Sequence, residues 1–269
     1  MRSRIFLVPA AIAIAAAACS RDAKRTPAMK AAAPPADPPA PAVISRSATA
    51  YRVIAVPDAG TITGTILREG PAGAPATIST GADSDACGAT VPDESVQGRG
   101  DALANAIVWL TDVRAGKPLP PQRRAELATS DCQVDPRVLA VAVGTTINVI
   151  SEDATLHRTQ FLADSSHRLL ATIQTVDTWQ VVPSAAIAAA PGLVDVRCVE
   201  HAFTRGYVGV FDHPYFAVTD DRGRFTLDGV PPGTYHLRLW HERGGPPRER
   251  TVTVAAGRAT TVSDTLHLR

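Results

Sequence analysis

The sequence predicts an all-β protein of sandwich type, and three observations carry this prediction. Short runs in which apolar and polar residues alternate recur from residue 60 to the end of the chain. Few stretches show the sustained 3.6-residue periodicity of an amphipathic helix. The 269 residues include 19 Gly and 22 Pro, which is typical of many turns between short elements. Together these features favour packed antiparallel sheets.

The expected strands follow one another at short intervals. They are residues 60–66, 105–110, 139–150 with a turn at Gly144, 193–199, 207–211, 223–227, 234–242, 250–257 and 260–268. Residues 122–129 fit one or two helical turns, and the Ala-rich residues 184–191 leave the type of element open.

The first residues are expected to be an export signal, residues 1–19. Arg2 and Arg4 precede the apolar run of residues 5–18, which is too short to span a bilayer comfortably and ends at Cys19. The sequence "AAAC" resembles a bacterial lipobox. That resemblance implies a lipidated Cys19 and, with Ser20 after it, a lipoprotein of the periplasm or outer membrane. Ordinary cleavage after an Ala-x-Ala sequence is the alternative.

Residues 20–50 are expected to be a disordered linker. The stretch 26–43 contains 7 Ala and 6 Pro, a composition that builds no core and favours a semi-extended tether. The folded part is therefore expected to start near Tyr51, with contact to the membrane only through the lipid anchor.

Charge excludes some classes of partner. Lys and Arg total 27 and Asp and Glu total 26, which gives a formal net charge of +1. Since no basic block stands out, neither nucleic acid nor an anionic lipid surface is expected as an electrostatic partner.

The C-terminal part carries two turn signals, "TDDRGRF" at 219–225 and "VPPGTY" at 230–235. These resemble the carboxypeptidase regulatory-like (transthyretin-like) sandwich family. Its first two strands resemble "GTITGTI" and "NAIVWL", which lie here more than a hundred residues before the first turn. The resemblance implies a split sandwich of residues 51–121 and 214–269, with a second domain, residues 122–213, inserted into it.

The insert resembles the cupredoxins, the blue-copper sandwich family, through "VLAVAVGTTINVISEDATLHRTQF" (138–161) and "GLVDVRCVEHAFTRGY" (192–207). This implies a Greek-key sandwich that binds copper through His157, Cys198 and His201. A thiolate with two imidazoles is a donor set that copper prefers. Thr204 stands where the family has its axial Met, and we expect it to serve as a weak axial donor at most. Arg158 replaces an Asn of the family, and a cation at that position is expected to oppose metal binding.

The four cysteines are Cys19, Cys87, Cys132 and Cys198. If Cys19 is lipidated, three remain, and one of them is unpaired in an oxidising compartment. We expect a disulfide between Cys87 and Cys132, which would tie the insert to its host. Cys198 is then the odd thiol, either a metal ligand or a buried free cysteine.

Two functions remain open. The first is copper binding for electron transfer or copper handling, with a redox partner protein. The second is a metal-free binding or scaffold module, of carbohydrate-binding-like type, that contacts polysaccharide or protein of the cell envelope. No enzyme is expected, because the Cys198–His201 pair lacks an evident Asn or Asp partner for nucleophilic catalysis.

Overall fold

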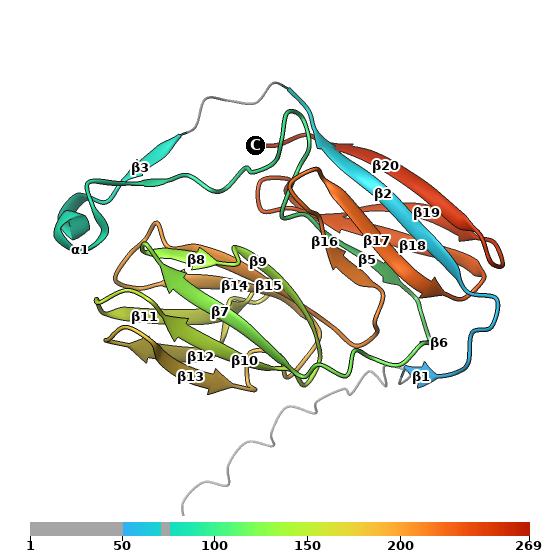
Figure 1. Ribbon diagram of the computed structural model, residues 1–269, viewed down its shortest axis with the longest axis horizontal. Helices are drawn as coiled ribbons and strands as arrows, with labels where there is room; N and C mark the ends of the chain where they lie inside the picture. The colour runs from blue at the N-terminus through green and yellow to red at the C-terminus, as the bar shows by residue number, and fades with distance from the viewer. Residues whose placement is uncertain (1–50, 71–75) are drawn as a thin grey trace, which may run out of the picture. The chain divides into compact units, whose positions relative to one another are not determined.

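The computed structural model describes residues 51–70 and 76–269 and is almost entirely β-structure (Figure 1). The prediction of an all-β sandwich protein is therefore confirmed. The expected export signal, its Cys19 and the linker of residues 20–50 lie outside the described residues. Within the described residues, no helix is long and apolar enough to cross a membrane.

One pair of sheets combines strands from both ends of the described chain. Its members, in sheet order, are β16 (Phe216–Val218), β5 (Ile107–Thr111), β18 (Gly233–Trp240) and β19 (Arg248–Val254), and β17 (Arg224–Val230), β2 (Gly60–Arg68) and β20 (Ala259–Leu266). The apolar positions of these strands alternate inward and share one core, which includes Ile62, Phe225 and Leu237. We call this unit the flanking sandwich.

The second pair of sheets uses the residues between β6 and β16 and is called the inserted sandwich. Its members, in sheet order, are β13 (Gln180–Ser184), β10 (Thr146–Ser151), β7 (Arg124–Ser130) and β8 (Gln133–Asp135), and β12 (Arg168–Thr175), β11 (His157–Ala163), β14 (Gly192–Cys198), β15 (Arg205–Phe211) and β9 (Val138–Ala142). Its separate core includes Leu127, Phe161 and Val196.

The remaining elements are short. β1 (Arg52–Val53) pairs with β6 (Ala115–Gly116), and β3 (Thr77–Ser79) pairs with β4 (Thr90–Pro92). Between β3 and β4 lie the 3-10 turn η1 (Gly81–Asp83) and the single-turn helix α1 (Ser84–Cys87). We call residues 77–92 the hairpin segment; it carries Cys87 and lies at upper left in Figure 1.

The helical interpretation of residues 122–129 is wrong, because residues 124–129 belong to the strand β7. This strand runs parallel to β10 and antiparallel to β8, and it buries Leu127 completely. Arg, Ala, Glu and Leu are good helix formers, but the pairing on both sides and the burial of one face outweigh that local preference.

The two sandwiches meet at a third apolar cluster, whose buried members are Ile107, Val138, Phe211 and Trp240. Trp240 contacts the ring of Tyr207 edge-on and is 7% exposed, so it is an interface residue. Beside it, Arg137 of the inserted sandwich forms a bidentate ion pair with Glu242, at 2.6 and 2.9 Å. Each of these two side chains is 7% exposed, so the pair ties the sandwiches together away from bulk water.

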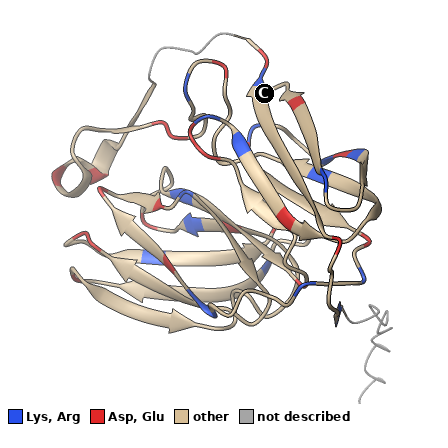
Figure 2. Ribbon diagram, turned by 45° about the vertical axis from the view of Figure 1, so that its right-hand side comes forward, with Lys and Arg blue, Asp and Glu red and all other residues tan. Residues whose placement is uncertain are grey.

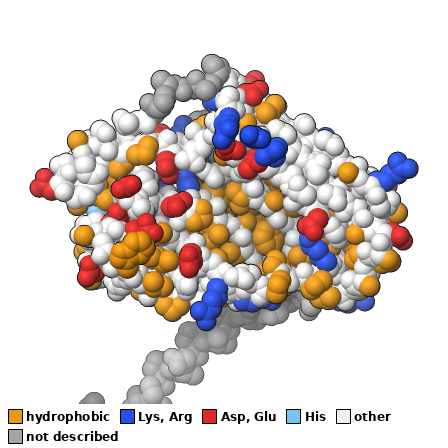
Figure 3. All heavy atoms as spheres, viewed as in Figure 1, with side chains coloured by type: hydrophobic (Ala, Val, Ile, Leu, Met, Phe, Trp, Pro, Cys, Tyr) orange, Lys and Arg blue, Asp and Glu red, His pale blue; other side chains and the backbone are white. Residues whose placement is uncertain are grey.

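Charge on the surface is mixed. Basic and acidic residues are interspersed along the ribbon of both sandwiches in Figure 2. Figure 3 shows apolar side chains between them on one face. This distribution agrees with the nearly balanced composition.

Candidate metal centre

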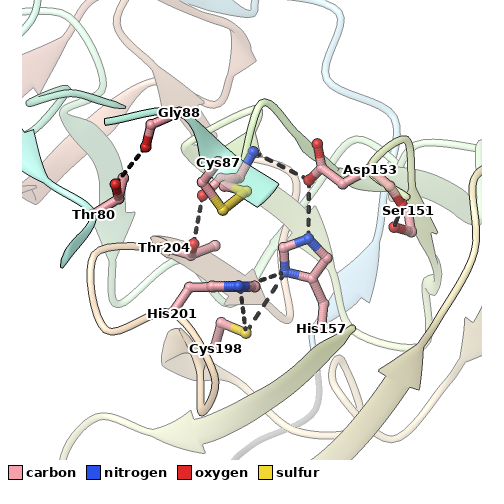
Figure 4. Close-up of a disulfide and its surroundings, with 10 residues drawn as sticks. Thr80, Cys87, Gly88, Ser151, Asp153, His157, Cys198, His201 and Thr204 are labelled. Atoms are coloured by element: carbon pink, nitrogen blue, oxygen red, sulfur yellow. Dashed lines mark hydrogen bonds and ion pairs between the residues drawn. A yellow bond between two sulfur atoms is a disulfide. The ribbon is translucent and has the colours of Figure 1, made fainter. Parts of the chain in front are cut away.

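Three of the predicted site residues converge at one end of the inserted sandwich (Figure 4). His157 is the first residue of β11, and Cys198 is the last residue of β14. Because Thr159 is opposite Cys198 in the antiparallel register, and successive side chains alternate, His157 and Cys198 point to the same face. That face is the interior, where His157 is fully buried and Cys198 is 5% exposed.

His201 reaches the same point from the turn between β14 and β15. The Cys198 N–H donates to the Thr204 carbonyl at 3.2 Å, and the Thr204 N–H donates to the His201 carbonyl at 2.9 Å. These bonds close the loop tightly and direct the His201 imidazole back over Cys198, so that His201 is only 3% exposed. The two residues between Cys198 and His201 therefore suffice to bring a thiol and an imidazole together.

The donor atoms form a compact triangle. Cys198 Sγ lies 3.7 Å from His157 Nδ1 and 3.7 Å from His201 Nδ1, and the two Nδ1 atoms lie 3.2 Å apart. A point equidistant from all three atoms is about 2 Å from each, close to the usual lengths of metal–imidazole and metal–thiolate bonds. The three residues thus fit a metal ion of copper or zinc size without rearrangement of the backbone.

Asp153 orients the His157 ring. Its Oδ2 lies 2.9 Å from His157 Nε2 and also accepts the Cys132 N–H at 3.1 Å. With the Nε2 proton donated to the carboxylate, the Nδ1 lone pair is directed at Cys198 and His201, as in carboxylate–histidine–metal arrangements. Asp153 was not among the predicted site residues; its position four residues before His157, just after a strand, was the signal that could have indicated it.

The charges of the three ligands depend on one another. Burial opposes ionisation of His157, but Asp153 and Cys198 outweigh it and raise the pKa of His157 to about 9. Burial also disfavours the Cys198 thiolate, but the hydrogen bonds from His157 and the His201 backbone N–H hold the pKa of Cys198 below its usual value. The pKa of His201 is lowered by burial and by the charge on His157. A metal ion bound between the three side chains would therefore displace the proton that His157 and Cys198 share.

Arg158 lies on the outer face of β11, because it follows the inward-facing His157 by one residue. Its guanidinium pairs with Glu200 at 3.0 Å. The expectation that Arg158 places an opposing charge in the site is therefore wrong: strand alternation turns it outward, and a carboxylate neutralises it.

Thr204 is almost fully buried, and its hydroxyl donates to the Cys132 carbonyl. This bond ties the loop that carries His201 to the β7–β8 turn. The assignment of Thr204 as a weak axial donor stays a prediction, while its hydrogen bond gives it a structural role.

The structure joins Cys87 and Cys132 in a disulfide, the pairing that the sequence led us to expect, and leaves Cys198 as a free buried thiol. Cys132 and Asp131 form the two-residue turn between β7 and β8, with φ of 58° and 49°. Two left-handed residues in succession are the signature of a type I′ hairpin turn. Nothing in the sequence indicated that this turn, and with it the disulfide, would lie against the candidate metal centre.

Comparison with known proteins gives two findings. Residues 208–268 match the model of the carboxypeptidase regulatory-like domain. Solved structures similar to the chain include a reduced Cu(I) form of an amicyanin variant, 24% identical, with a TM-score of 0.29 over 33% of this chain and 82% of that one. Another is a purple cupredoxin from Nitrosopumilus maritimus, 18% identical, with a TM-score of 0.27 over 32% and 99%.

None of the curated proteins matches the chain. The comparisons thus identify a carboxypeptidase regulatory-like domain at residues 208–268 and cupredoxins among the structural neighbours of the chain.

Proposed function

We propose that this protein binds one copper ion through His157, Cys198 and His201 and serves electron transfer or copper handling without being an enzyme. The observation that carries the proposal is the buried triangle of one sulfur and two Nδ1 atoms. Soft thiolate together with imidazole favours copper among the first-row metals. When bound, copper supplies a centre that takes up and releases a single electron.

Each residue of the proposed site has a distinct role in metal binding. Cys198 contributes the thiolate, which neighbouring donors already stabilise. His157 and His201 contribute neutral nitrogens once the metal has displaced the extra proton of His157. Asp153 holds the Nε2 proton of His157, so that Nδ1 is the atom offered to the metal. Burial of all three ligands keeps water away from the donor atoms.

Export and a lipid anchor at Cys19 are parts of the same proposal. A linker of residues 20–50 would hold the copper centre away from the membrane, within reach of a redox partner protein or a component of the cell envelope.

Titration of the full-length protein with Cu(II), followed by visible absorption, tests the copper centre. We expect an intense thiolate-to-copper band at one equivalent of copper, lost in Cys198→Ser. Replacement of His157 by Asn is expected to weaken or shift the band strongly, whereas His167→Asn, at an exposed histidine, leaves it unchanged. A protein without the band, or a band that survives Cys198→Ser, contradicts the proposal.

A second candidate function, the metal-free binding module, is favoured by a groove at the junction of the two sandwiches. The groove has a volume of about 450 Å³, and its lining includes Trp109, Asp112, Asp212 and Arg238. An aromatic ring beside carboxylate and guanidinium groups suits a sugar, which offers both an apolar face and hydroxyls. Binding of soluble fragments of cell-envelope polysaccharide, lost in Trp109→Ala, would support it; equal binding by that variant would contradict it.

A further inference from the structure

A second group of metal-binding residues adjoins the first. The sulfurs of Cys87 and Cys132 and a ring nitrogen of His201 all lie within 4.8 Å of one another. In Figure 4 the disulfide lies on one side of the His201 imidazole, and Cys198 lies on the other. His201 is therefore placed between the disulfide and the single sulfur of Cys198.

The position of Cys132 does not depend on the disulfide alone. Its N–H donates to Asp153 at 3.1 Å, its carbonyl accepts the Thr204 hydroxyl, and it is 1% exposed. The tight turn between β7 and β8 fixes its backbone as well. Reduction of the disulfide would therefore leave the Cys132 sulfur beside His201.

Cys87 is also held by contacts within its own segment. The ladder of β3 and β4 closes the hairpin segment at its base. Inside it, the Thr80 hydroxyl donates to the Gly88 carbonyl, and the Thr80 N–H donates to the Ala89 carbonyl at 3.2 Å. These bonds keep the turn that carries Cys87 in its local conformation when the sulfur–sulfur bond is absent.

We propose that reduction of the Cys87–Cys132 disulfide creates a second metal site, in which the two thiolates and His201 bind a soft monovalent cation of the Cu(I) type. A dithiol reductant supplies two electrons and two protons: its two sulfurs form a disulfide, the Cys87–Cys132 bond breaks, and each cysteine receives one hydrogen. Binding of Cu(I) then displaces the two thiol protons to solvent. Two thiolates with one imidazole form a three-coordinate set suited to a soft ion.

His201 belongs to both ligand sets, so the two sites compete for it. Of these two sets, the oxidised protein offers the one with His157 and Cys198, whereas the reduced protein offers both. The redox state of the disulfide thus determines which sulfur ligands are available to copper. The second site does not require the first to be functional, because it uses different sulfurs.

The test uses the full-length protein with Cys198→Ser, which removes the thiolate of the first site and leaves the second intact. This variant is reduced with a phosphine, freed of reductant under anaerobic conditions, and titrated with Cu(I) against a colorimetric Cu(I) chelator. We expect one Cu(I) per chain, held about tenfold or more tightly than by the same variant with its disulfide intact.

The matched control adds Cys132→Gly, which removes one thiol and suits the left-handed backbone of the turn. If this control competes for Cu(I) as well as its parent, the proposal is overturned. Far-UV circular dichroism of the reduced protein gives a second readout: loss of the β-spectrum on reduction would mean that no preformed site exists, which also overturns it.

The two proposals fail independently. Absence of the Cu(II) band in the oxidised wild-type protein contradicts the copper centre of His157, Cys198 and His201. It does not affect Cu(I) binding by the reduced Cys198→Ser variant, which decides the second site together with the Cys132→Gly control and the circular dichroism spectrum.

Discussion

The two sandwiches share an architecture but differ in what they bury. The flanking sandwich encloses an almost wholly apolar core, and its buried Thr219 hydroxyl donates to the Leu103 carbonyl and accepts the Ala106 N–H. The inserted sandwich buries His157, Cys198 and His201 at one end of its core, with their nitrogen and sulfur atoms facing one another. His213 and His241 are also buried, but among the described residues neither belongs to a cluster of metal-binding donors. This difference supports the inserted sandwich as the place of the proposed copper centre.

The largest expected effect is a loss of stability when a buried phenylalanine ring is removed from either core, which leaves a cavity. Phe161→Ala and Phe225→Ala remove fully or almost fully buried rings, and each is expected to lower the free energy of unfolding by about 3–5 kcal/mol. Because Phe161 shares β11 with His157, only its loss should also change the copper band. Chemical denaturation and visible spectra of both variants measure this. Equal spectral change in both variants would contradict the division of roles.

The next largest effect is the loss of stability at low pH that we expect from the buried His241. Burial, with Arg137 and Arg243 nearby, lowers the pKa of His241 from 6.5 to about 4. Because the pKa is lowered in the folded protein, the unfolded chain takes up the proton first as the pH falls. The stability of the folded protein that depends on a neutral His241 is therefore present above pH 6.5 and is lost as the pH falls toward 4. This loss amounts to about 3 kcal/mol, from 1.36 kcal/mol for each pKa unit.

The variant that isolates this effect is His241→Asn. In the wild type, the Arg243 backbone N–H donates to His241 Nδ1 at 3.2 Å. The side-chain oxygen of Asn can accept the same hydrogen bond. Unfolding measured at pH 7 and pH 4 should show a smaller acid loss in the variant than in the wild type. An identical loss in both would show that His241 does not stay neutral in the folded protein.

A smaller effect should follow from Asp153→Asn in the inserted sandwich. The amide keeps the size of the carboxylate but holds the Nε2 proton of His157 less strongly, so copper affinity should fall by about 10- to 100-fold. Competition with a copper chelator measures this fall. Asp177→Asn, at an exposed carboxylate, is the matched control and should leave affinity unchanged. If the two variants bind copper alike, Asp153 does not orient the ligand.

Strand periodicity predicted most of the flanking sandwich, since buried side chains alternate with half-buried ones in β2 and with more exposed ones in β17 and β20. It missed β12 and β13, which are edge strands with half-exposed side chains and give little apolar signal. At the candidate centre, the Cys-x-x-His spacing was visible in the sequence. The contacts of Asp153 and of the disulfide were not, because they join segments through tertiary packing.

The smallest expected effect is the change in copper affinity when Arg158 is replaced. Its size tests whether Arg158 opposes metal binding, as the sequence led us to expect, or faces outward, as in the structure. A cation directed into the site would weaken copper binding severely, and its removal would raise affinity many-fold. An outward-facing guanidinium paired with Glu200 is an exposed ion pair, worth less than about 1 kcal/mol. Arg158→Ser should therefore change copper affinity by no more than about fivefold, the ratio equivalent to that energy, and should leave the visible band in place. A much larger gain in affinity would mean that Arg158 faces the metal and that β11 does not alternate as described.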